Sequence, residues 1–447
     1  MRQTGLLLSI ILLGALAACG ERAGPAAVGR DSRPNFIVIV LDDWGWRDYG
    51  WVTPGISTPN LDAIARDGFR FDNAFLTTSS CSPSRASILM GRYPTSTGAP
   101  HLGDEVPPGF SSIPQELGSS GYYTESFGKW HLGDAFKTRF QRVRADRKGA
   151  GEAHWSQLAR ELPLDRPFFL WLASFDPHVP HAAEDRFRVH DPTQIALPEY
   201  LVDTPSGRQA YAAYLDELHR VDYYLGEFLR TLGERGLLEN TWVFVLSDNG
   251  APTPFAKATL YDSGIRTPLL VLAPQLRGDY SGLVSSVDLA PTILELAGLA
   301  APGVLQGHSF AEAFRNPAYR HREYVFAELN NHASARSHTA VRSSDYLLIR
   351  NHFQDKVCVK EMGPLWRDLV RANKARTAAP LQKLCYRPPP PVQFFRVGES
   401  GYEARNLAGR PGVAAEQQRL EHALDGWQQL YRADTCPDIV CARGLLP

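Results

Sequence analysis

Short apolar runs alternate along the chain with longer segments of helical periodicity. The run at residues 35–41, Asn-Phe-Ile-Val-Ile-Val-Leu, is continuous and rich in β-branched side chains, which is typical of a strand buried on both faces. Further strands are predicted at residues 168–175, 241–246 and 268–273, and helices at residues 58–68, 206–235 and 288–297. This alternation indicates an α/β fold with a large, doubly wound, mostly parallel sheet and flanking helices.

The pattern changes near residue 320. Beyond it come shorter pieces, including residues 340–350, a proline run at 388–391 and a final helix near 414–431. We therefore expect a main domain over residues 35–320 and a smaller C-terminal α+β subdomain over residues 321–447. Within the main domain, the helix at 58–68 has clear start and stop signals, with Thr58 as the capping residue, Pro59 in its first turn and Gly68 after its last.

The first residues are typical of a targeting segment. Arg2 precedes an apolar run at 6–18, which is shorter than the roughly 20 residues needed to cross a bilayer. The run ends in Leu-Ala-Ala-Cys-Gly, which resembles a bacterial lipobox with Cys19 as the lipidated residue. We expect a signal peptide at 1–18, a flexible tether at 19–34 and an exported bacterial lipoprotein, anchored to a membrane in the periplasm or at the cell surface. A plain signal peptide is the alternative.

Composition excludes several classes of protein. Hydrophobic residues make up 44% of the 447 residues and charged residues 21%, as in ordinary globular proteins. The chain has 47 Lys and Arg against 48 Asp and Glu, so the formal charge is -1 and we expect no nucleic-acid partner. Besides Cys19 and Cys81, four cysteines form an even set that two disulfides would satisfy, although four reduced thiols are the alternative. They are Cys358, Cys385, Cys436 and Cys441.

Polar side chains follow three of the predicted strands at the point where each ends. Asp42 and Asp43 come directly after the first strand, and His178 follows the second. Asp248 and Asn249 follow the third. Because α/β sheets bind ligands at the carboxyl ends of their strands, we expect these residues to share a site. Three carboxylates and an amide oxygen suit a hard cation, Ca²⁺ before Mg²⁺ or a transition metal, whereas an Asp pair alone is often only a turn.

The most specific signal is the segment at residues 80–92, Ser-Cys-Ser-Pro-Ser-Arg-Ala-Ser-Ile-Leu-Met-Gly-Arg. Pro83 suits the first turn of a helix that runs to about Met90, so Cys81 would lie at the positive end of that helix, where backbone N–H groups favour an anion. Arg85 falls one turn later on the same helical face and offers a planar fork of donors to anion oxygens.

Cys81, Pro83 and Arg85 match C-x-P-x-R, which resembles the recognition core of the type I sulfatases, formylglycine-dependent enzymes of the alkaline phosphatase superfamily. Other matches cover most of the chain. They are Gly-Lys-Trp-His-Leu-Gly at 128–133, Asp-Pro-His at 176–178, Ser-Asp-Asn-Gly at 247–250, Lys257, and Glu-Ala-Arg-Asn-Leu at 403–407. The resemblance implies an alkaline-phosphatase-like fold, with residues 35–320 as the sulfatase catalytic domain.

Within that family the chain is most similar to the heparan N-sulfatases, or sulfamidases. The likeness lies in residues 79–87, in Asp-Thr-Pro at 203–205 and in the Trp-Gln pair at 427–428. Lys257 and the segment Asp-Ser-Gly-Ile-Arg at 262–266 depart from the sulfamidase pattern and look more like O-sulfatases. Whether the substrate carries O-sulfate or N-sulfate therefore stays open.

The resemblance implies a modified residue and a metal ion. A formylglycine-generating enzyme would convert Cys81 to Cα-formylglycine, whose hydrate supplies the oxygen that attacks sulfur, and whose second hydroxyl later helps to expel sulfate. One Ca²⁺ would bind the substrate sulfate and residue 81. The implied calcium ligands are Asp42, Asp43, Cys81 after conversion, Asp248 and Asn249.

The family pattern also implies roles for the cationic residues and histidines. His178 or Lys257 would protonate the leaving atom, and His131 would be the base for the second hydroxyl. Asp176, Glu184 and Arg266 are candidate sugar contacts by adjacency alone. The residues expected to contact the sulfate are Arg85, Lys129, Lys257 and His178.

The expected function is hydrolysis of sulfate from a sulfated sugar or glycan, such as a glycosaminoglycan. A phosphodiesterase or phosphonate hydrolase of the same superfamily is one alternative, although its zinc-dependent members need more His and Asp ligands than this chain offers. The other alternative is a lipoprotein that binds sulfated glycans without turnover, which requires that Cys81 stays a thiol.

Overall fold

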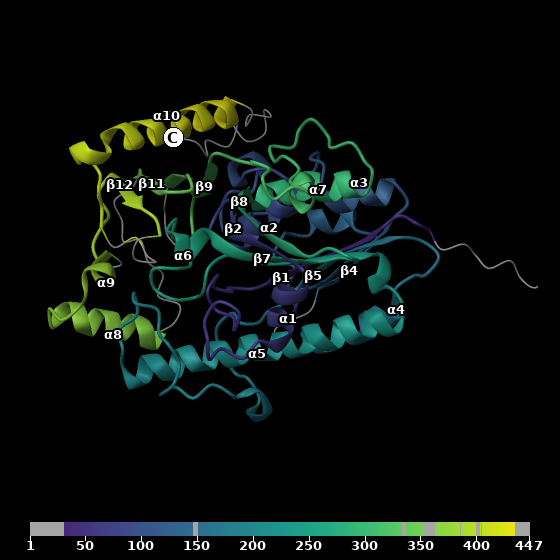
Figure 1. Cartoon of the computed structure of the whole chain (residues 1–447), viewed down its shortest axis with the longest axis horizontal. Coiled ribbons are helices and arrows are strands. Elements are labelled where there is room, and N and C mark those ends of the chain that lie inside the picture. The colour runs from purple at the N-terminus through teal and green to yellow at the C-terminus, as the bar shows by residue number, and fades with distance from the viewer. Residues whose placement is uncertain are drawn as a thin grey trace, which may run out of the picture.

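The computed structural model describes residues 31–145, 151–332, 337–352, 363–384, 386–398, 403 and 405–433. An eight-stranded sheet has helices on both faces, and a four-stranded sheet lies beside it (Figure 1). The strand order of the large sheet is β4-β3-β5-β1-β6-β7-β2-β8. Its strands are β1 Asn35–Leu41, β2 Phe69–Phe75, β3 Tyr123–Gly128, β4 Arg142–Ala145, β5 Phe168–Ala173, β6 Thr241–Ser247, β7 Arg266–Leu272 and β8 Gly278–Ser285.

Most neighbouring strands of the large sheet are parallel. β1 pairs in parallel with β5 on one side and with β6 on the other, and β3 pairs in parallel with β4 and β5. β2 and β8 are parallel as well. The prediction of an α/β fold with a mostly parallel sheet is therefore confirmed.

β7 is the exception, because it runs antiparallel to both β6 and β2. A parallel return needs a crossover connection of a dozen or more residues, usually a helix that covers one sheet face. The segment between β6 and β7 instead folds back on itself, with the Gly250 N–H donating to the Gly264 carbonyl at 2.9 Å. It contains only one short helix, α6 (Asp262–Ile265). β7 therefore begins beside the carboxyl end of β6 and runs back in the opposite direction.

β1 is buried on both faces, and its alternate residues enter two separate cores. Ile37 and Ile39 pack in the core beneath α1, α4 and α5. Phe36, Val38 and Val40 pack on the other face, beneath α2, α3 and α7 (Figure 1). These helices are α1 Pro59–Asp67, α2 Cys81–Met90, α3 Ile113–Ser119, α4 Trp155–Glu161, α5 Pro205–Glu234 and α7 Leu289–Leu296.

The second sheet is antiparallel, with the order β12-β11-β10-β9. Helix α10 (Ala414–Ala433) lies along it, and Trp427 stacks on Phe326 of β9 with ring centroids 5.3 Å apart. The predicted C-terminal α+β subdomain is confirmed, while its boundary at residue 320 stays a prediction. The other elements of this region are β9 Val325–Leu329, β10 His338–Arg342, β11 Tyr346–Asn351, β12 Val392–Arg396, α8 Gly363–Lys374 and α9 Pro380–Leu384.

The cap of α1 differs from the prediction. Thr58 precedes the helix, but its hydroxyl donates to Asp62 Oδ1 at 3.0 Å and makes no capping bond. The N–H groups of Asn60 and Leu61 donate instead to the carboxylate of Asp222 on α5, at 3.1 and 2.7 Å. Because Asp222 lies far along the chain, the residues around Thr58 do not reveal this cap.

Some predicted features lie outside the described residues and stay predictions. They are the signal peptide at 1–18, most of the tether at 19–34, and Cys358, Cys385, Cys436 and Cys441. Within the described ranges, none of the helices combines the length and the apolar character that crossing a membrane requires.

Candidate active site

The carboxyl ends of β5, β1 and β6 lie together at one edge of the large sheet, because β1 is the middle strand of the three. Asp42 and Asp43 follow β1, and Asp248 follows β6. Asp43 has a left-handed backbone with φ of 65°, and its N–H donates to Asp248 Oδ1 at 3.2 Å. The structure therefore brings the strand-end carboxylates together, as the sequence predicts.

These carboxylates form a candidate metal site with residue 81. One ligand atom from each of Asp42, Asp43, Cys81 and Asp248 lies within 4.8 Å of the others, and all four residues are buried. Asn249 belongs to the same site, because its Nδ2 donates to Asp43 Oδ1 at 2.6 Å.

The orientation of the Asn249 amide is fixed, since Nδ2 also donates to the Gly250 carbonyl at 2.9 Å. Its Oδ1 is buried without a hydrogen-bond partner, and so is Oδ1 of Asp42. Burying such an oxygen without a partner is costly, so both atoms fit ligands of a cation. An all-oxygen set of this kind suits a hard divalent ion, and the residues present therefore fit a bound Ca²⁺.

Cys81 is the first residue of α2, and only 2% of it is exposed. The Ser84 N–H closes the first turn by donating to the Ser80 carbonyl at 3.0 Å, and Pro83 lies within that turn as predicted. Burial raises the pKa of the Cys81 thiol well above its usual range, although Lys129 and Lys257 act in the opposite direction. An unmodified Cys81 is therefore a neutral thiol near pH 7 and a poor nucleophile.

Arg85 lies one turn after Cys81 and is completely buried. Its Nε and Nη2 lie 2.8 and 2.7 Å from Asp248 Oδ2, and its Nη1 donates to the Lys129 carbonyl at 3.1 Å. Burial opposes the charge of Arg85, but Asp248 and Asp42 outweigh it and raise its pKa. The guanidinium is thus a fixed positive charge beside the nucleophile position.

Two lysines complete the cationic side of the site. Lys257 is 1% exposed, and its Nζ donates to Asp43 Oδ2 at 2.9 Å. Lys129 Nζ is paired with Asp42 Oδ2. Each of the three carboxylates Asp42, Asp43 and Asp248 is thus paired with a cationic side chain, and Arg85 Nη2 also lies 3.6 Å from Asp42 Oδ1. Both lysines are where the sequence pattern predicts them, and neither is a solvated surface residue.

The position of Lys129 depends on the glycine before it. Gly128 ends β3 with φ of 98°, and a Cβ atom there would lie 2.0 Å from the Ala173 carbonyl oxygen of β5. Only glycine allows this approach. The Lys129 N–H then donates to the same carbonyl at 2.9 Å, which directs the lysine toward the ends of the central strands.

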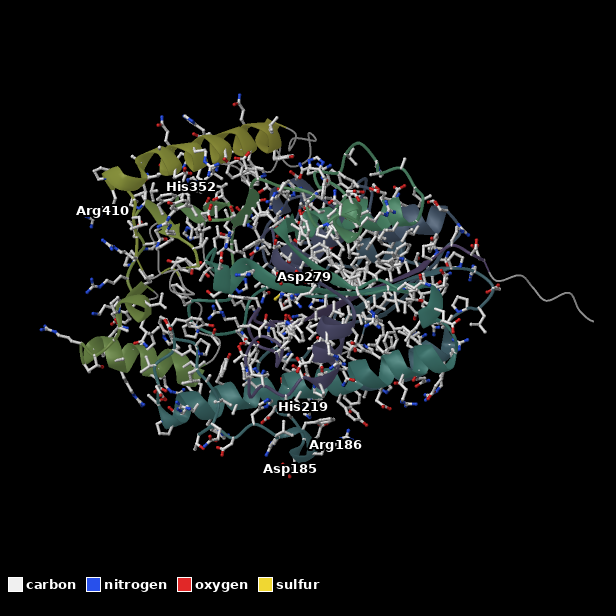
Figure 2. The ribbon with its side chains drawn as sticks, viewed as in Figure 1. Asp185, Arg186, His219, Asp279, His352 and Arg410 are labelled. Atoms are coloured by element: carbon white, nitrogen blue, oxygen red, sulfur yellow. The ribbon has the colours of Figure 1, made fainter. Side chains whose placement is uncertain are left out.

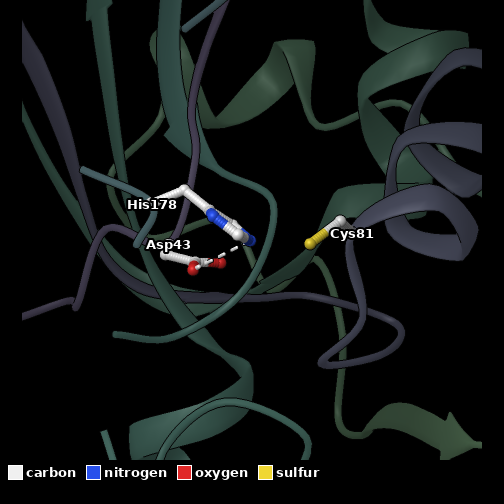
Figure 3. A group of neighbouring side chains, drawn as sticks. All are labelled: Asp43, Cys81 and His178. Carbon is white, nitrogen blue, oxygen red and sulfur yellow. Dashed lines mark ion pairs between the residues drawn. The ribbon is translucent and has the colours of Figure 1, made fainter. Parts of the chain in front are cut away.

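His178 and His131 also belong to the site. Figure 3 shows His178 beside Asp43 and Cys81, with its Nε2 3.8 Å from Asp43 Oδ2. Its Nδ1 lies 2.7 Å from the Val179 carbonyl, which only accepts, so Nδ1 carries a proton and Nε2 faces the site. Burial, helped by Lys129 and Arg85, lowers the pKa of His131 to about 3, so its ring is neutral near pH 7.

Asp176, Glu184 and Arg266, the predicted sugar contacts, each pair with another side chain of the protein. Asp176 is buried, and both of its carboxylate oxygens accept from Arg220 on α5, at 2.7 and 2.9 Å. Glu184 accepts from the same guanidinium at 2.9 Å. Both acids are thus paired with Arg220, and their role as sugar contacts stays a prediction. The guanidinium of Arg266 lies over the Trp46 ring, 3.9 Å from its centroid.

Other neighbours of the site were not predicted. His332 Nδ1 lies 2.8 Å from the Ser80 hydroxyl, next to Cys81, and the Gly103 N–H donates to the Ser82 hydroxyl at 2.8 Å. Both contacts come from segments distant in sequence, and no local motif marks His332 or Gly103.

Comparisons with known proteins agree with this geometry. Residues 34–299 match the sulfatase family, and residues 250–377 match the family described as N-sulphoglucosamine sulphohydrolase, C-terminal. N-sulphoglucosamine sulphohydrolase of Homo sapiens is 28% identical over 460 residues, covering 89% of this chain and 90% of that protein. An ulvan-active sulfatase of Formosa agariphila is 27% identical over 459 residues, covering 88% of this chain and 74% of that protein.

The fold has solved relatives too. A protein in complex with its substrate D-glucosamine-2-N,6-O-disulfate matches with a TM-score of 0.72 and 19% identity, covering 90% of this chain and 98% of the other. The sulfatase match covers more than half of the chain and includes Cys81, Arg85 and the strand-end carboxylates. The chain therefore belongs to the sulfatase family of hydrolases.

Proposed function

We propose that this protein hydrolyses sulfate from a sulfated saccharide, and that it does so at residue 81 after Cys81 has been converted to Cα-formylglycine. The observation that carries the proposal is the buried group of Asp42, Asp43, Asp248 and Cys81, whose ligand atoms lie within 4.8 Å of one another. Arg85, Lys129 and Lys257 surround this group with positive charge.

Two groups would supply chemistry that the side chains of the chain lack. A hydrated aldehyde carries two hydroxyls on one carbon, so one can attack sulfur and the other can help to expel sulfate, a route closed to an ordinary Ser or Cys. A bound Ca²⁺ would lower the pKa of a coordinated hydroxyl and offset the charge of the sulfate. The side chains that would hold the ion are Asp42, Asp43, Asp248 and Asn249, together with converted residue 81.

The charge of the site suits a sulfate group. Without the metal the paired carboxylates and cationic side chains balance, and a divalent ion adds positive charge that a sulfate ester anion would offset. Arg85, Lys129 and Lys257, which pair with the carboxylates around Cys81, would donate to the sulfate oxygens.

We assign the proton transfers to the two histidines. With Nδ1 of His178 donating to a carbonyl, Nε2 is the ring atom that faces the site, 3.8 Å from Asp43 Oδ2. His178 would protonate the leaving oxygen or nitrogen of the sugar. His131, which the family pattern implies as the base, would accept the proton of the second hydroxyl; its ring is neutral near pH 7, and burial together with the charges of Lys129 and Arg85 disfavours its protonation.

For the substrate we propose a sulfated saccharide of the glycosaminoglycan or algal type, in line with the substrates named for the relatives above. A screen of N-sulfated and O-sulfated glucosamine separates the sulfamidase reaction from ester hydrolysis. Release of sulfate from neither would remove this substrate class. Hydrolysis of phosphate esters alone would favour the phosphodiesterase alternative.

We also propose that the protein is exported and anchored by a lipid on Cys19. The support is the lipobox-like Leu-Ala-Ala-Cys-Gly at residues 16–20. Labelling with radioactive palmitate in the native host should mark the protein, and Cys19→Ala should remove the label. Unlabelled wild-type protein would contradict the anchor.

Mass spectrometry of a peptide spanning residues 77–85 tests the nucleophile directly. We expect an aldehyde at position 81 in protein from the native host, and no turnover by Cys81→Ala. The matched control is Ser84→Ala, which lies in the same helix, keeps the C-x-P-x-R residues and loses only a buried hydroxyl without a hydrogen bond. An active preparation that carries only thiol at position 81 would contradict the proposal.

A further inference from the structure

Four polar side chains form a row on the buried side of α5. Tyr211, Tyr214, Glu217 and Arg220 are three residues apart, so they follow one oblique ridge of the helix. All four are 9% exposed or less. The opposite side of α5 faces away from the large sheet. Figure 2 shows His219 on that side, near Asp185 and Arg186. A row of buried polar groups requires partners, and these partners are two loops of the active site.

The tyrosine end of the row holds the loop after β1. Tyr211 donates to Asp48 Oδ1 at 2.6 Å, and the Tyr214 hydroxyl lies 2.9 Å from Asp48 Oδ2. The same hydroxyl accepts from the Gly45 N–H at 3.0 Å and lies 3.2 Å from the Asp43 carbonyl oxygen. Tyr214 thus bonds to both ends of the turn that begins at Asp43, the residue with the left-handed backbone.

The arginine end holds the loop after β5. Arg220 donates two hydrogen bonds to the Asp176 carboxylate, of 2.7 and 2.9 Å, and its third nitrogen donates to Glu184 at 2.9 Å. Glu217 accepts from the Ala182 N–H. His178 lies between these anchor points, and its N–H donates to the Phe175 carbonyl at 2.9 Å.

The two loops also touch each other. The Asp42 N–H donates to the Asp176 carbonyl at 3.3 Å. Asp176, which Arg220 holds, therefore contacts the end of β1, where the candidate metal ligands Asp42 and Asp43 lie. None of the four side chains of the row is among the groups expected to contact sulfate or metal.

We propose that this row positions the catalytic centre: Tyr214 sets the place of Asp43 in the metal site, and Arg220 sets the place of His178. The chemical roles of Asp43 and His178 rest on the proposed function, whereas the contacts do not. Tyr214 and Arg220 are positioning residues, since each acts through a second residue.

Substitutions at the two ends of the row should impair different properties, calcium binding at the Tyr214 end and turnover at the Arg220 end. Tyr214→Phe keeps the ring and removes the hydroxyl, so we expect calcium to bind about 10–100-fold more weakly, as for other partners of metal ligands. Arg220→Lys keeps the charge and loses the planar fork, so we expect kcat to fall about 10–100-fold while KM stays within about threefold. Calcium affinity should fall far less in Arg220→Lys than in Tyr214→Phe, because the loop after β5 carries no proposed calcium ligand and meets Asp42 only through one backbone hydrogen bond of 3.3 Å.

Calcium titration calorimetry and steady-state kinetics of the full chain test this split. Tyr223→Phe and Arg230→Lys are matched controls on α5, since Tyr223 is 42% exposed and Arg230 pairs with the surface residues Glu227 and Glu234. Both controls should bind calcium and turn over substrate like the wild type. If Arg220→Lys does not fold, Glu184→Gln should lower kcat in the same direction by less.

Two results would overturn the inference. One is wild-type calcium affinity in Tyr214→Phe, and the other is wild-type kcat in a folded Arg220→Lys protein whose unfolding temperature alone has changed. Neither depends on the outcome for Cys81. If the wild-type protein desulfated nothing, the calcium titration of Tyr214→Phe would still decide half of the proposal, and an active wild type with unaffected variants would remove only this inference.

Discussion

The Asn249 side chain shows how a single residue contributes to the site. Its amide nitrogen is fixed by Asp43 and by the Gly250 carbonyl, and its buried oxygen has no hydrogen-bond partner. A cation at that oxygen would satisfy an atom whose burial is otherwise unfavourable. Asn249 is expected to bind the metal only, so a substitution there tests metal binding without removing a residue that contacts sulfate or transfers a proton.

We expect Asn249→Ala to weaken calcium binding by about tenfold or more. Activity should fall at low calcium and recover in part at saturating calcium, because the three carboxylates remain. Titration of activity against calcium after treatment with a chelator measures the shift. Asn240→Ala is the control, since Asn240 bonds to the Arg33 carbonyl, away from the site. An unchanged calcium dependence in Asn249→Ala would exclude this ligand.

The strand-end residues were predictable because each directly follows an apolar run whose strand type is clear, as with Asp42 after β1. Arg220 and Tyr214 were not. Asp176 and Asp43, the residues that they hold, lie 44 and 171 residues away along the chain, and on a helix Arg220 and Tyr214 have the spacing of ordinary core positions. Local patterns identify side chains that do chemistry, but the groups that hold them depend on tertiary packing.

At the scale of elements, the clearest consequence concerns α1 and α5. The carboxylate of Asp222 satisfies the N–H groups of Asn60 and Leu61 at the start of α1. We expect Asp222→Ala to lower the free energy of unfolding by about 1–3 kcal/mol, because it leaves two backbone N–H groups and the Asn60 side-chain amide without their carboxylate acceptor.

Urea unfolding followed by circular dichroism measures this change. Glu234→Ala at the end of the same helix is the control, since solvent screens its exposed pair with Arg230 and the pair contributes little to stability. Equal losses in Asp222→Ala and in the control would show that Asp222 is not the cap.

Strands differ in how well their sequences reveal them. β1, β5 and β6 are continuous apolar runs and were predicted with nearly their observed bounds. β2, Phe-Arg-Phe-Asp-Asn-Ala-Phe, was not predicted, because charged side chains interrupt its apolar pattern. β7 was predicted as a strand, yet its antiparallel direction depends on how the segment after Gly250 folds.

At the scale of the whole molecule, the C-terminal sheet holds a segment of the main domain next to the site. Arg342 of β10 forms a fork with Asp262, at 3.0 and 3.1 Å, and Glu403 accepts from the Asp262 N–H at 2.6 Å. Gln393 of β12 donates to the Tyr261 hydroxyl at 2.9 Å. The sequence predicted the existence of this subdomain, but not that Glu403 binds the start of α6.

Glu403 makes this junction sensitive to pH. Burial, and then the charge of Asp262, raise the pKa of Glu403 well above its usual range. Above about pH 4.3 the unfolded chain releases this proton while the folded protein keeps it. The unfolded state then binds fewer protons, so the free energy of unfolding falls as the pH rises, until the folded carboxyl ionises as well.

We expect Glu403→Gln to remove this loss. The amide keeps an oxygen for the Asp262 N–H and does not ionise, so the variant should lose less stability than the wild type between about pH 5 and pH 8. Urea unfolding at both pH values gives the two differences, and Glu312→Gln, at an exposed position, should follow the wild type. Parallel pH profiles for Glu403→Gln and the wild type would mean that Glu403 ionises in its usual range, and that the junction tolerates its charge.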